Sequence, residues 1–270
     1  MSKRNSQAAK TAARERLRVE REREAKKAKV KRQLIVAGSI VGVLAIAGGI
    51  GYAVVQANQP SAWEAAEDAK LVKPANSSGE NGTTVVVGKA DAKKTLELYE
   101  DPRCPICATF EQGVGKTIEK DVADGKYKVQ FIGASFLDRN LTGEGSKNAL
   151  SALGAALNVS PEAFLAYKAA LYSAEFHPEE SQDKFKDDSY LIKVANSVEE
   201  LKDNKKFQTA VENGTYDRWA LEMSKKFDDS DVKGTPTLMM DGKKVTGADG
   251  QNAPMTAPEF TAAIDKALKA

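Results

Sequence analysis

The sequence contains very few of the residues from which metal sites and hydrolytic sites are built. It has two cysteines and one histidine, His177, in 270 residues. Three such side chains fall short of the four ligands that structural zinc usually takes. A Ser–His–Asp site is not expected, because the one histidine is predicted in a surface loop, and the chain contains no phosphate-binding loop and no internal repeat. We therefore expect no metal and no bound cofactor, and a fold that does not depend on structural disulfides.

Both cysteines lie in one short motif, Cys104-Pro-Ile-Cys107. A run with strand character, Leu96–Tyr99, precedes the motif. Apolar residues recur every four positions after it, which is typical of one face of a helix: Phe110, Val114, Ile118 and Val122. The motif is therefore predicted at a junction between a strand and a helix, with Pro105 in the first helical turn.

That position predicts redox chemistry. The first turn of a helix presents free N–H groups and a partial positive charge, which favour a thiolate over a thiol. We expect Cys104 to be the exposed attacking thiolate and the more shielded Cys107 to be its resolving partner. Two alternatives are an inert structural disulfide and half of a zinc site.

A second segment follows about 130 residues later, Val232–Gly242 (VKGTPTLMMDG). Together with CPIC, it resembles the thioredoxin fold in its DsbA-like, membrane-anchored bacterial form, over roughly residues 83–270. The resemblance implies that Pro236 is cis and packs against the cysteines. It also implies that Gly234, Thr235 and Pro236 help to hold an extended substrate peptide, and that the redox-active disulfide takes the place of a cofactor.

Four positions near the motif bear on the match to the family pattern: Leu98, Asp101, Arg103 and Ile106. Ile106 stands where DsbA-type oxidases commonly have a histidine that stabilises the thiolate, and isoleucine cannot donate that hydrogen bond. Leu98 stands where many relatives have a buried acid. Asp101 matches a common acidic position, with a simple turn residue as the alternative. Arg103 is interpreted either as a stabiliser of the thiolate or as a solvated side chain.

The N-terminal part of the chain predicts a membrane anchor. Residues 1–33 contain thirteen Lys and Arg and four Glu, a net charge of +9, and have helical composition. Residues 34–55 contain no charge and span roughly 33 Å as a helix, enough to cross a bilayer. The basic flank predicts a cytoplasmic N-terminus and a catalytic domain on the outer face.

This region has three other interpretations. A secretory signal peptide is the main alternative, with a weak cleavage site at Val55–Ala57. Nucleic-acid binding by the basic segment explains the charge less well than a membrane flank does. Gly38 and Gly42 form a GxxxG spacing, weak evidence for dimerisation, so a monomer is expected.

Residues 56–82 are predicted to be a polar linker with little fixed structure apart from a helical turn near Trp63–Leu71, and Trp63 to be an anchor at the membrane interface. The catalytic domain, 83–270, is predicted to be α/β, with a helical insertion at about 143–228 in the thioredoxin core. The remaining predictions concern single elements: strands at Thr84–Gly88, Lys94–Glu100 and Lys126–Gly133, a hairpin at Thr237–Met240 and Lys243–Thr246, and a last helix from Thr256 whose capping box includes Glu259.

Aromatic residues of the insertion could form a substrate groove, but core packing is the preferred interpretation: Phe164, Tyr190 and Trp219. His177 is predicted in a surface loop. The predicted function is an extracytoplasmic thiol-disulfide oxidoreductase that introduces disulfides into exported cysteine-containing proteins and exchanges electrons with a membrane redox partner. The alternatives are a reductase or isomerase of the same fold, for example in cytochrome maturation, and a redox-inactive anchored binding module.

Overall fold

The structure is a computed structural model that describes residues 61–270 without a gap. Of the preceding chain it describes only 14–16, 18, 20–24, 26–27, 29 and 31, which are helical and exposed. The chain divides into two compact units, Met1–Ser61 and Ala62–Ala270. The predicted span at 34–55 lies outside the described residues, and no helix among those described is long and apolar enough to cross a membrane.

The second unit is built on a sheet of five strands in the order β1-β3-β2-β4-β5. The central strand β2 pairs in parallel with β3 and antiparallel with β4. Its Leu96 and Leu98 point to one face of the sheet and are fully buried, and Tyr99, which points to the other face, is buried as well, so both faces are covered at this strand. The bounds confirm the predicted strands, with shorter ends: β1 Val85–Val87, β2 Thr95–Glu100, β3 Lys128–Gly133, β4 Thr237–Met240 and β5 Lys243–Lys244.

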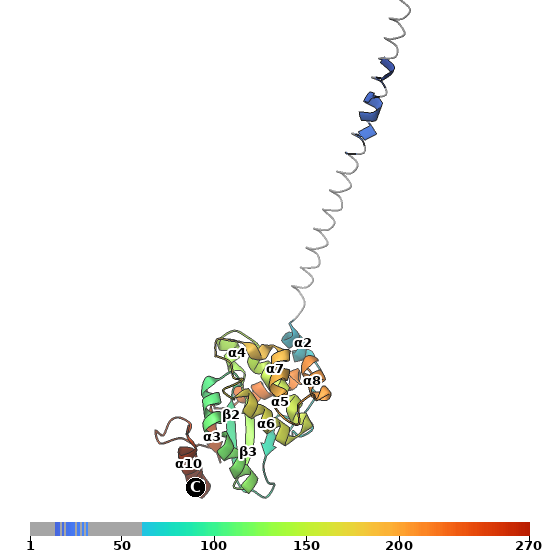
Figure 1. The fold of residues 1–270 in the computed structure, drawn as a ribbon. Helices are drawn as coiled ribbons and strands as arrows, with labels where there is room; N and C mark the ends of the chain where they lie inside the picture. The colour runs from blue at the N-terminus through green and yellow to red at the C-terminus, as the bar shows by residue number, and fades with distance from the viewer. Residues whose placement is uncertain are drawn as a thin grey trace, which may run out of the picture. The chain divides into compact units, whose positions relative to one another are not determined.

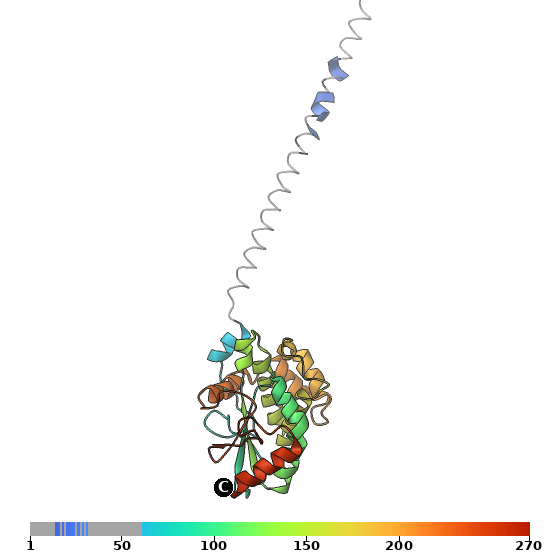
Figure 2. The ribbon, with the colours of Figure 1, turned by 90° about the vertical axis from the view of Figure 1, so that its left-hand side faces the viewer.

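Helix α3 (Pro105–Asp124) connects β2 to β3, as the predicted strand–helix–strand order requires. Its apolar stripe is buried, and it ends at Gly125, whose φ of 80° is the left-handed conformation that glycine adopts at low cost. The C-terminal helix α10 (Ala257–Lys269) packs beside α3, with Phe110 and Phe260 in edge-to-face contact at 6.4 Å. Figures 1 and 2 show α3 and α10 on one side of the sheet.

The predicted helical insertion covers the other side of the sheet (Figure 1). Helix α5 is central and contacts α6, α7, α8 and α9. Ser160 caps α6 by accepting a hydrogen bond from Ala163 N. Core packing is confirmed for Phe164 and Trp219, which are buried, whereas Tyr190 is half-buried. The helices are α4 Phe136–Asn140, α5 Gly145–Val159, α6 Pro161–Leu171, η1 Lys184–Lys186, α7 Asp188–Ala195, α8 Lys205–Glu212 and α9 Asp217–Asp228.

The segment before β1 differs from the predicted linker. Helix α2 (Ala62–Asp68) contacts α9, and Trp63 is only 7% exposed, with the Lys147 ammonium 5.0 Å from its ring centroid. The interpretation of Trp63 as an interface anchor is therefore wrong. Further along, Asn76 donates to Leu157 O, and Gly82 O accepts from the Trp219 indole. Apolar burial and these hydrogen bonds hold residues 62–82 on the domain.

Two local predictions also need correction. The hairpin turn at Asp241 and Gly242 is present, with φ of 51° and 73°, but its second strand is only two residues long. Thr256 is the N-cap of α10 without a side-chain capping bond. Glu259 accepts instead from the amides of Ala248 and Met255, so it orders the preceding loop and does not complete a capping box.

Candidate active site

The two cysteines lie where the sequence predicts, at the junction of β2 and α3. Cys104 is the N-cap residue of α3 and Pro105 occupies the first turn. The Cys104 amide donates to Asp101 O at 2.9 Å, which closes a tight turn before the helix. Both cysteines are free thiols; Cys104 is 8% exposed and Cys107 is fully buried. Cys104 is thus less exposed than expected, but it is the more accessible sulfur of the pair.

The segment before β4 lies next to these sulfurs. The peptide bond between Thr235 and Pro236 is cis, as the resemblance predicts. The Cys104 thiol contacts Thr235 O at 3.7 Å, although the two residues are 131 positions apart. Pairing of β4 with β2 brings this segment to the cysteines. The Thr235 hydroxyl is buried and has no hydrogen-bond partner among the described residues, so a donor is available beside the thiols.

The surroundings separate the pKa values of the two thiols. The pKa of Cys104 falls to about 6, chiefly because the Cys107 thiol donates a hydrogen bond to its thiolate. The Thr235 side chain and the backbone at Ile106 and Cys107 act in the same direction, and burial opposes them. Burial raises the pKa of Cys107 well above its ordinary value. The arrangement therefore contains one reactive thiolate and one protonated partner at neutral pH.

A buried acid lies at the end of β2, two positions from the site where the family pattern places one. The Glu100 carboxylate is 3.0 Å from the Lys168 ammonium, which also pairs with Glu111 at 2.5 Å. Burial, opposed by Lys168, raises the pKa of Glu100 to about 7. Its Oε1 has no hydrogen-bond partner among the described residues, and the side chain lines a cavity of about 30 Å³.

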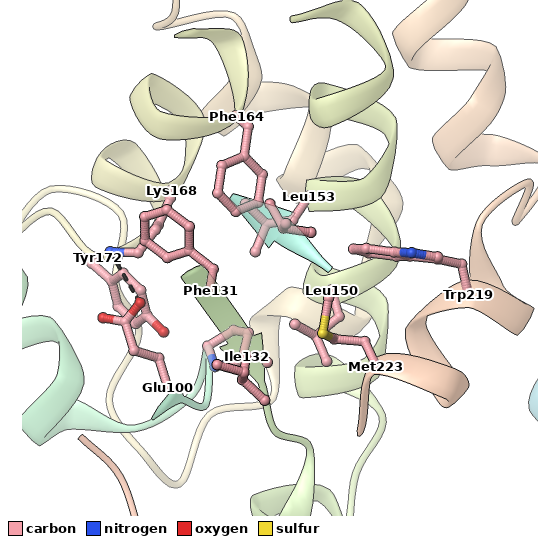
Figure 3. A pocket seen from close by; sticks show the side chains of 13 residues that line it. Glu100, Phe131, Ile132, Leu150, Leu153, Phe164, Lys168, Tyr172, Trp219 and Met223 are labelled. Atoms are coloured by element: carbon pink, nitrogen blue, oxygen red, sulfur yellow. Dashed lines mark ion pairs between the residues drawn. The ribbon is translucent and has the colours of Figure 1, made fainter. Parts of the chain in front are cut away.

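Figure 3 shows how this cavity is lined. Glu100, Lys168 and Tyr172 gather at one side of it, whereas Leu150, Trp219 and Met223 supply an apolar wall. About 30 Å³ is room for a single water molecule. The burial of Glu100 could not be predicted from the sequence, because strand alternation alone does not say whether Glu97 or Glu100 faces inward.

Asp101 and Arg103 are both buried and belong to a polar network that holds the turn before Cys104. Asp101 accepts hydrogen bonds from Arg103 N, Ser146 Oγ and Leu137 N, and burial raises its pKa to about 7. The Arg103 guanidinium pairs with Asp138 at 2.9 Å. Arg103 is therefore not solvated, and its charge is directed to carboxylates and not to the thiolate.

Ile106, in contrast, is 54% exposed. It lines a groove of about 730 Å³ together with Thr235 and Pro236. The opposite wall comes from the loop before α10 and the first turn of that helix: Ala248, Asp249, Asn252, Ala253, Met255 and Glu259. An open groove of this size beside a reactive sulfur can accommodate a segment of extended polypeptide. Gly234, the third predicted binding residue, is half-buried, and its carbonyl accepts from Thr237 Oγ1 at 2.8 Å.

The sequence pattern indicated neither the place of Tyr172 nor the partial burial of His177. Tyr172 is buried in one cluster with Cys104 and Cys107. His177 lies in a loop, as predicted, but is half-buried, and its Nε2 is 3.1 Å from Pro102 O. These contacts join residues as many as 75 positions apart. No local pattern marks such residues.

Comparisons with known proteins agree with this geometry. Residues 80–266 match the sequence model of the thioredoxin family. Disulfide bond formation protein D of Bacillus subtilis is 27% identical over 164 residues, which cover 59% of this chain and 68% of that protein. The serine/threonine-protein kinase PknE of Mycobacterium tuberculosis is 29% identical over 119 residues. That match covers 42% of this chain but only about a fifth of the kinase.

Among solved structures, the oxidised DsbA of M. tuberculosis superposes with a TM-score of 0.56 at 24% identity, covering 69% of this chain and 93% of that one. The chain thus combines a thioredoxin fold with inserted helices and a cysteine pair at the start of α3. A cysteine pair in this position is typical of proteins that exchange thiols and disulfides. The chain belongs to the thioredoxin family, as a thiol-disulfide oxidoreductase of the DsbA-like type.

Proposed function

We propose that this protein introduces disulfides into exported cysteine-containing proteins, with Cys104 as the attacked and attacking sulfur and Cys107 as its partner. The observation that carries the proposal is the difference in pKa between the two thiols. The pKa of Cys104 is lowered to about 6, and that of the buried Cys107 beside it is raised. Their placement against Thr235 and Pro236, at the edge of an open groove, supports a polypeptide as substrate.

In the oxidising direction, a substrate thiolate attacks Cys104 of the Cys104–Cys107 disulfide. The bond between the two cysteines breaks, and Cys107 leaves with the electron pair and takes up a proton. A second substrate thiolate then attacks the substrate sulfur of the mixed disulfide, and Cys104 leaves as a thiolate. The substrate loses two electrons and gains a disulfide, and the enzyme is left as the dithiol. A membrane redox partner would reoxidise it.

The direction of exchange depends on whether the reduced or the oxidised form of the enzyme is the more stable one. A low pKa of Cys104 stabilises the reduced form as a thiolate and makes Cys104 the better leaving group, which favours oxidation of the substrate. Ile106 cannot provide the donor that a histidine would supply at that position. The Cys107 thiol, the backbone at Cys107 and the Thr235 side chain take over this role, since all three lower the pKa of Cys104.

Glu100 is the group best suited to exchange a proton with Cys107. A leaving Cys107 needs a proton, and its thiolate is disfavoured both by burial and by the negative charge of Glu100. With a pKa raised to about 7, Glu100 is readily protonated at neutral pH and is therefore an effective acid. Lys168 keeps the charged form of Glu100 accessible, because its ammonium pairs with the Glu100 carboxylate.

A reductase or isomerase of the same fold is the second candidate, and Ile106 is the observation that favours it, because it removes the expected thiolate donor. Equilibration of the full chain in detergent with glutathione buffers gives the reduction potential. We expect a value in the oxidising range of roughly −120 to −180 mV. A potential near about −270 mV would assign the reducing direction. Cys104→Ser must abolish peptide oxidation; equal activity in the variant would assign a redox-inactive module.

We also propose that residues 34–55 anchor the chain once in the cell membrane, with residues 1–33 in the cytoplasm and the catalytic domain outside. The charge asymmetry of the sequence supports this. Because the chain has only two cysteines, a membrane-impermeant maleimide reports the location of Cys104 directly. Labelling in intact cells after mild reduction is expected, with Cys104→Ser as the control; labelling only after lysis would contradict an outer location.

A further inference from the structure

The loop between α6 and η1, residues 172–183, lies against the turn that carries Cys104. It contacts this turn at two places besides the buried cluster of Tyr172 with Cys104 and Cys107. His177 Nε2 is 3.1 Å from Pro102 O, and Arg103 reaches Glu180 O at 3.4 Å and Asp183 at 3.3 Å. The helical insertion thus contributes directly to the shape of the active-site turn.

His177 is held in one orientation by its neighbours. Its ring stacks on Tyr172, with centroids 5.9 Å apart and planes at 21°, and meets the edge of Phe185 at 6.0 Å. Tyr172 is in turn buried against Cys104 and Cys107. The imidazole therefore forms the outer layer of a stack whose inner layer covers the two sulfurs.

The hydrogen bond to Pro102 O is a structural link that the turn itself does not provide. Within the turn, the amides of Arg103 and Cys104 donate to the side chain and carbonyl of Asp101. The carbonyl of Pro102 is bound from outside, by His177. Burial lowers the pKa of His177, so the ring is neutral at pH 7, and the bond requires the tautomer with a proton on Nε2.

We propose that His177 is a positioning residue for disulfide exchange: its Nε2–H holds the Pro102 carbonyl and thereby fixes the Asp101–Cys104 turn that presents the Cys104 sulfur at the start of α3. This inference rests on the proposed function. Loss of the bond leaves the turn held by Asp101 and Arg103 alone and therefore less rigid, so the sulfur spends less time beside the donors of the first helical turn and Thr235. Its thiolate is then less stable and exchange is slower.

Two substitutions distinguish the effect of the hydrogen-bond donor from the effect of the aromatic ring. His177→Phe keeps an aromatic ring in the stack but cannot donate to Pro102 O. His177→Gln loses the ring but places an amide N–H at about the distance of Nε2. We expect H177F to slow exchange with a reduced dicysteine peptide about fivefold, the equivalent of one ordinary hydrogen bond. The Cys104 thiolate titration should move up by about half a pH unit. H177Q should stay within about twofold of the wild-type rate.

The readouts are the thiolate absorbance and the exchange rate of the full chain in detergent, with circular dichroism as a check of folding. A purely structural role would lower the unfolding temperature and leave the thiolate titration unchanged. Wild-type titration in H177F, or a defect in folded H177Q equal to that of H177F, would overturn the proposal. If H177Q does not fold, H177F against the wild type decides. Failure of the wild type to exchange would contradict the proposed function, while the titration would still test His177.

Discussion

At the scale of single residues, the reactivity of Cys104 depends on the first-turn amides that the sequence predicts and on two side chains that it does not, Cys107 and Thr235. Its motif has Ile106 in place of a histidine, yet its pKa is lowered to about 6. The donors, in order of their effect, are the Cys107 thiol, the backbone at Cys107, the Thr235 side chain beside the cis proline and the backbone at Ile106. The CPIC spacing predicted the pair and its order of reactivity. The Thr235 donor could not be predicted from spacing, because this residue reaches Cys104 only through the pairing of β4 with β2.

Thr235→Val removes the hydroxyl and keeps the shape of the side chain. We expect a less stable Cys104 thiolate and therefore a less oxidising protein, by about 30 mV for each tenfold loss in the exchange equilibrium. Thr235→Ser, which keeps the hydroxyl, is the matched control and should stay near the wild type. Glutathione equilibration measures both. Equal potentials in the Val and Ser variants would mean that the hydroxyl does not act on the thiolate.

Glu100 predicts a dependence of stability on pH. Its pKa is raised to about 7 in the folded protein, from an ordinary value of about 4.3. The folded state thus binds this proton more tightly than the unfolded chain. The contribution of Glu100 to the free energy of unfolding therefore rises as the pH falls from about 7 to about 4.3.

Denaturant unfolding of the oxidised protein tests this sign, since Cys104 does not titrate as a disulfide. Glu100→Gln removes the titrating group, while Lys168 keeps its pairing with Glu111. The free energy of unfolding of the wild type, minus that of E100Q, should increase across this window as the pH falls. A flat difference, or one that decreases, would show that the pKa of Glu100 is not raised.

At the scale of elements, the helical insertion supplies parts of the active site. Helix α4 and the start of α5 provide Asp138 and Ser146, which bind Arg103 and Asp101, and α6 provides Lys168. Hydrophobic periodicity predicted the strands, α3 and most helices of the insertion, because each is a local pattern. It could not predict these polar contacts, which join segments far apart in the chain.

Arg103→Met tests whether the polar network stabilises the turn before Cys104. The variant leaves Asp138 buried without its cation, so we expect a loss of about 3–5 kcal/mol in the free energy of unfolding. Arg139→Met is the control, because its ion pair with Asp228 is largely exposed and should contribute less than about 1 kcal/mol. Urea titration measures both. Similar losses in the two variants would contradict a special role for the buried pair.

At the scale of the whole molecule, the folded domain begins earlier than the composition predicted. A tryptophan soon after a long apolar run is compatible with either a membrane interface or a protein core, and the sequence does not distinguish them. Trp63 is in the core.

Trp63→Ala should therefore destabilise the catalytic domain, by about 3 kcal/mol, because it removes a large buried ring. Val72→Ala, at a site 38% exposed, should change stability by less than about 0.5 kcal/mol. Unfolding of both variants is followed in detergent by circular dichroism. A wild-type stability in W63A would mean that α2 is not part of the folded unit.

The central claim is that Cys104 is a thiolate at neutral pH even though its motif lacks a histidine. The most direct measurement is the titration of thiolate absorbance in the reduced protein, with Cys104→Ser as the blank. We predict a midpoint near pH 6 that disappears in the blank. A midpoint at the ordinary thiol value of about 8.5 would contradict the account.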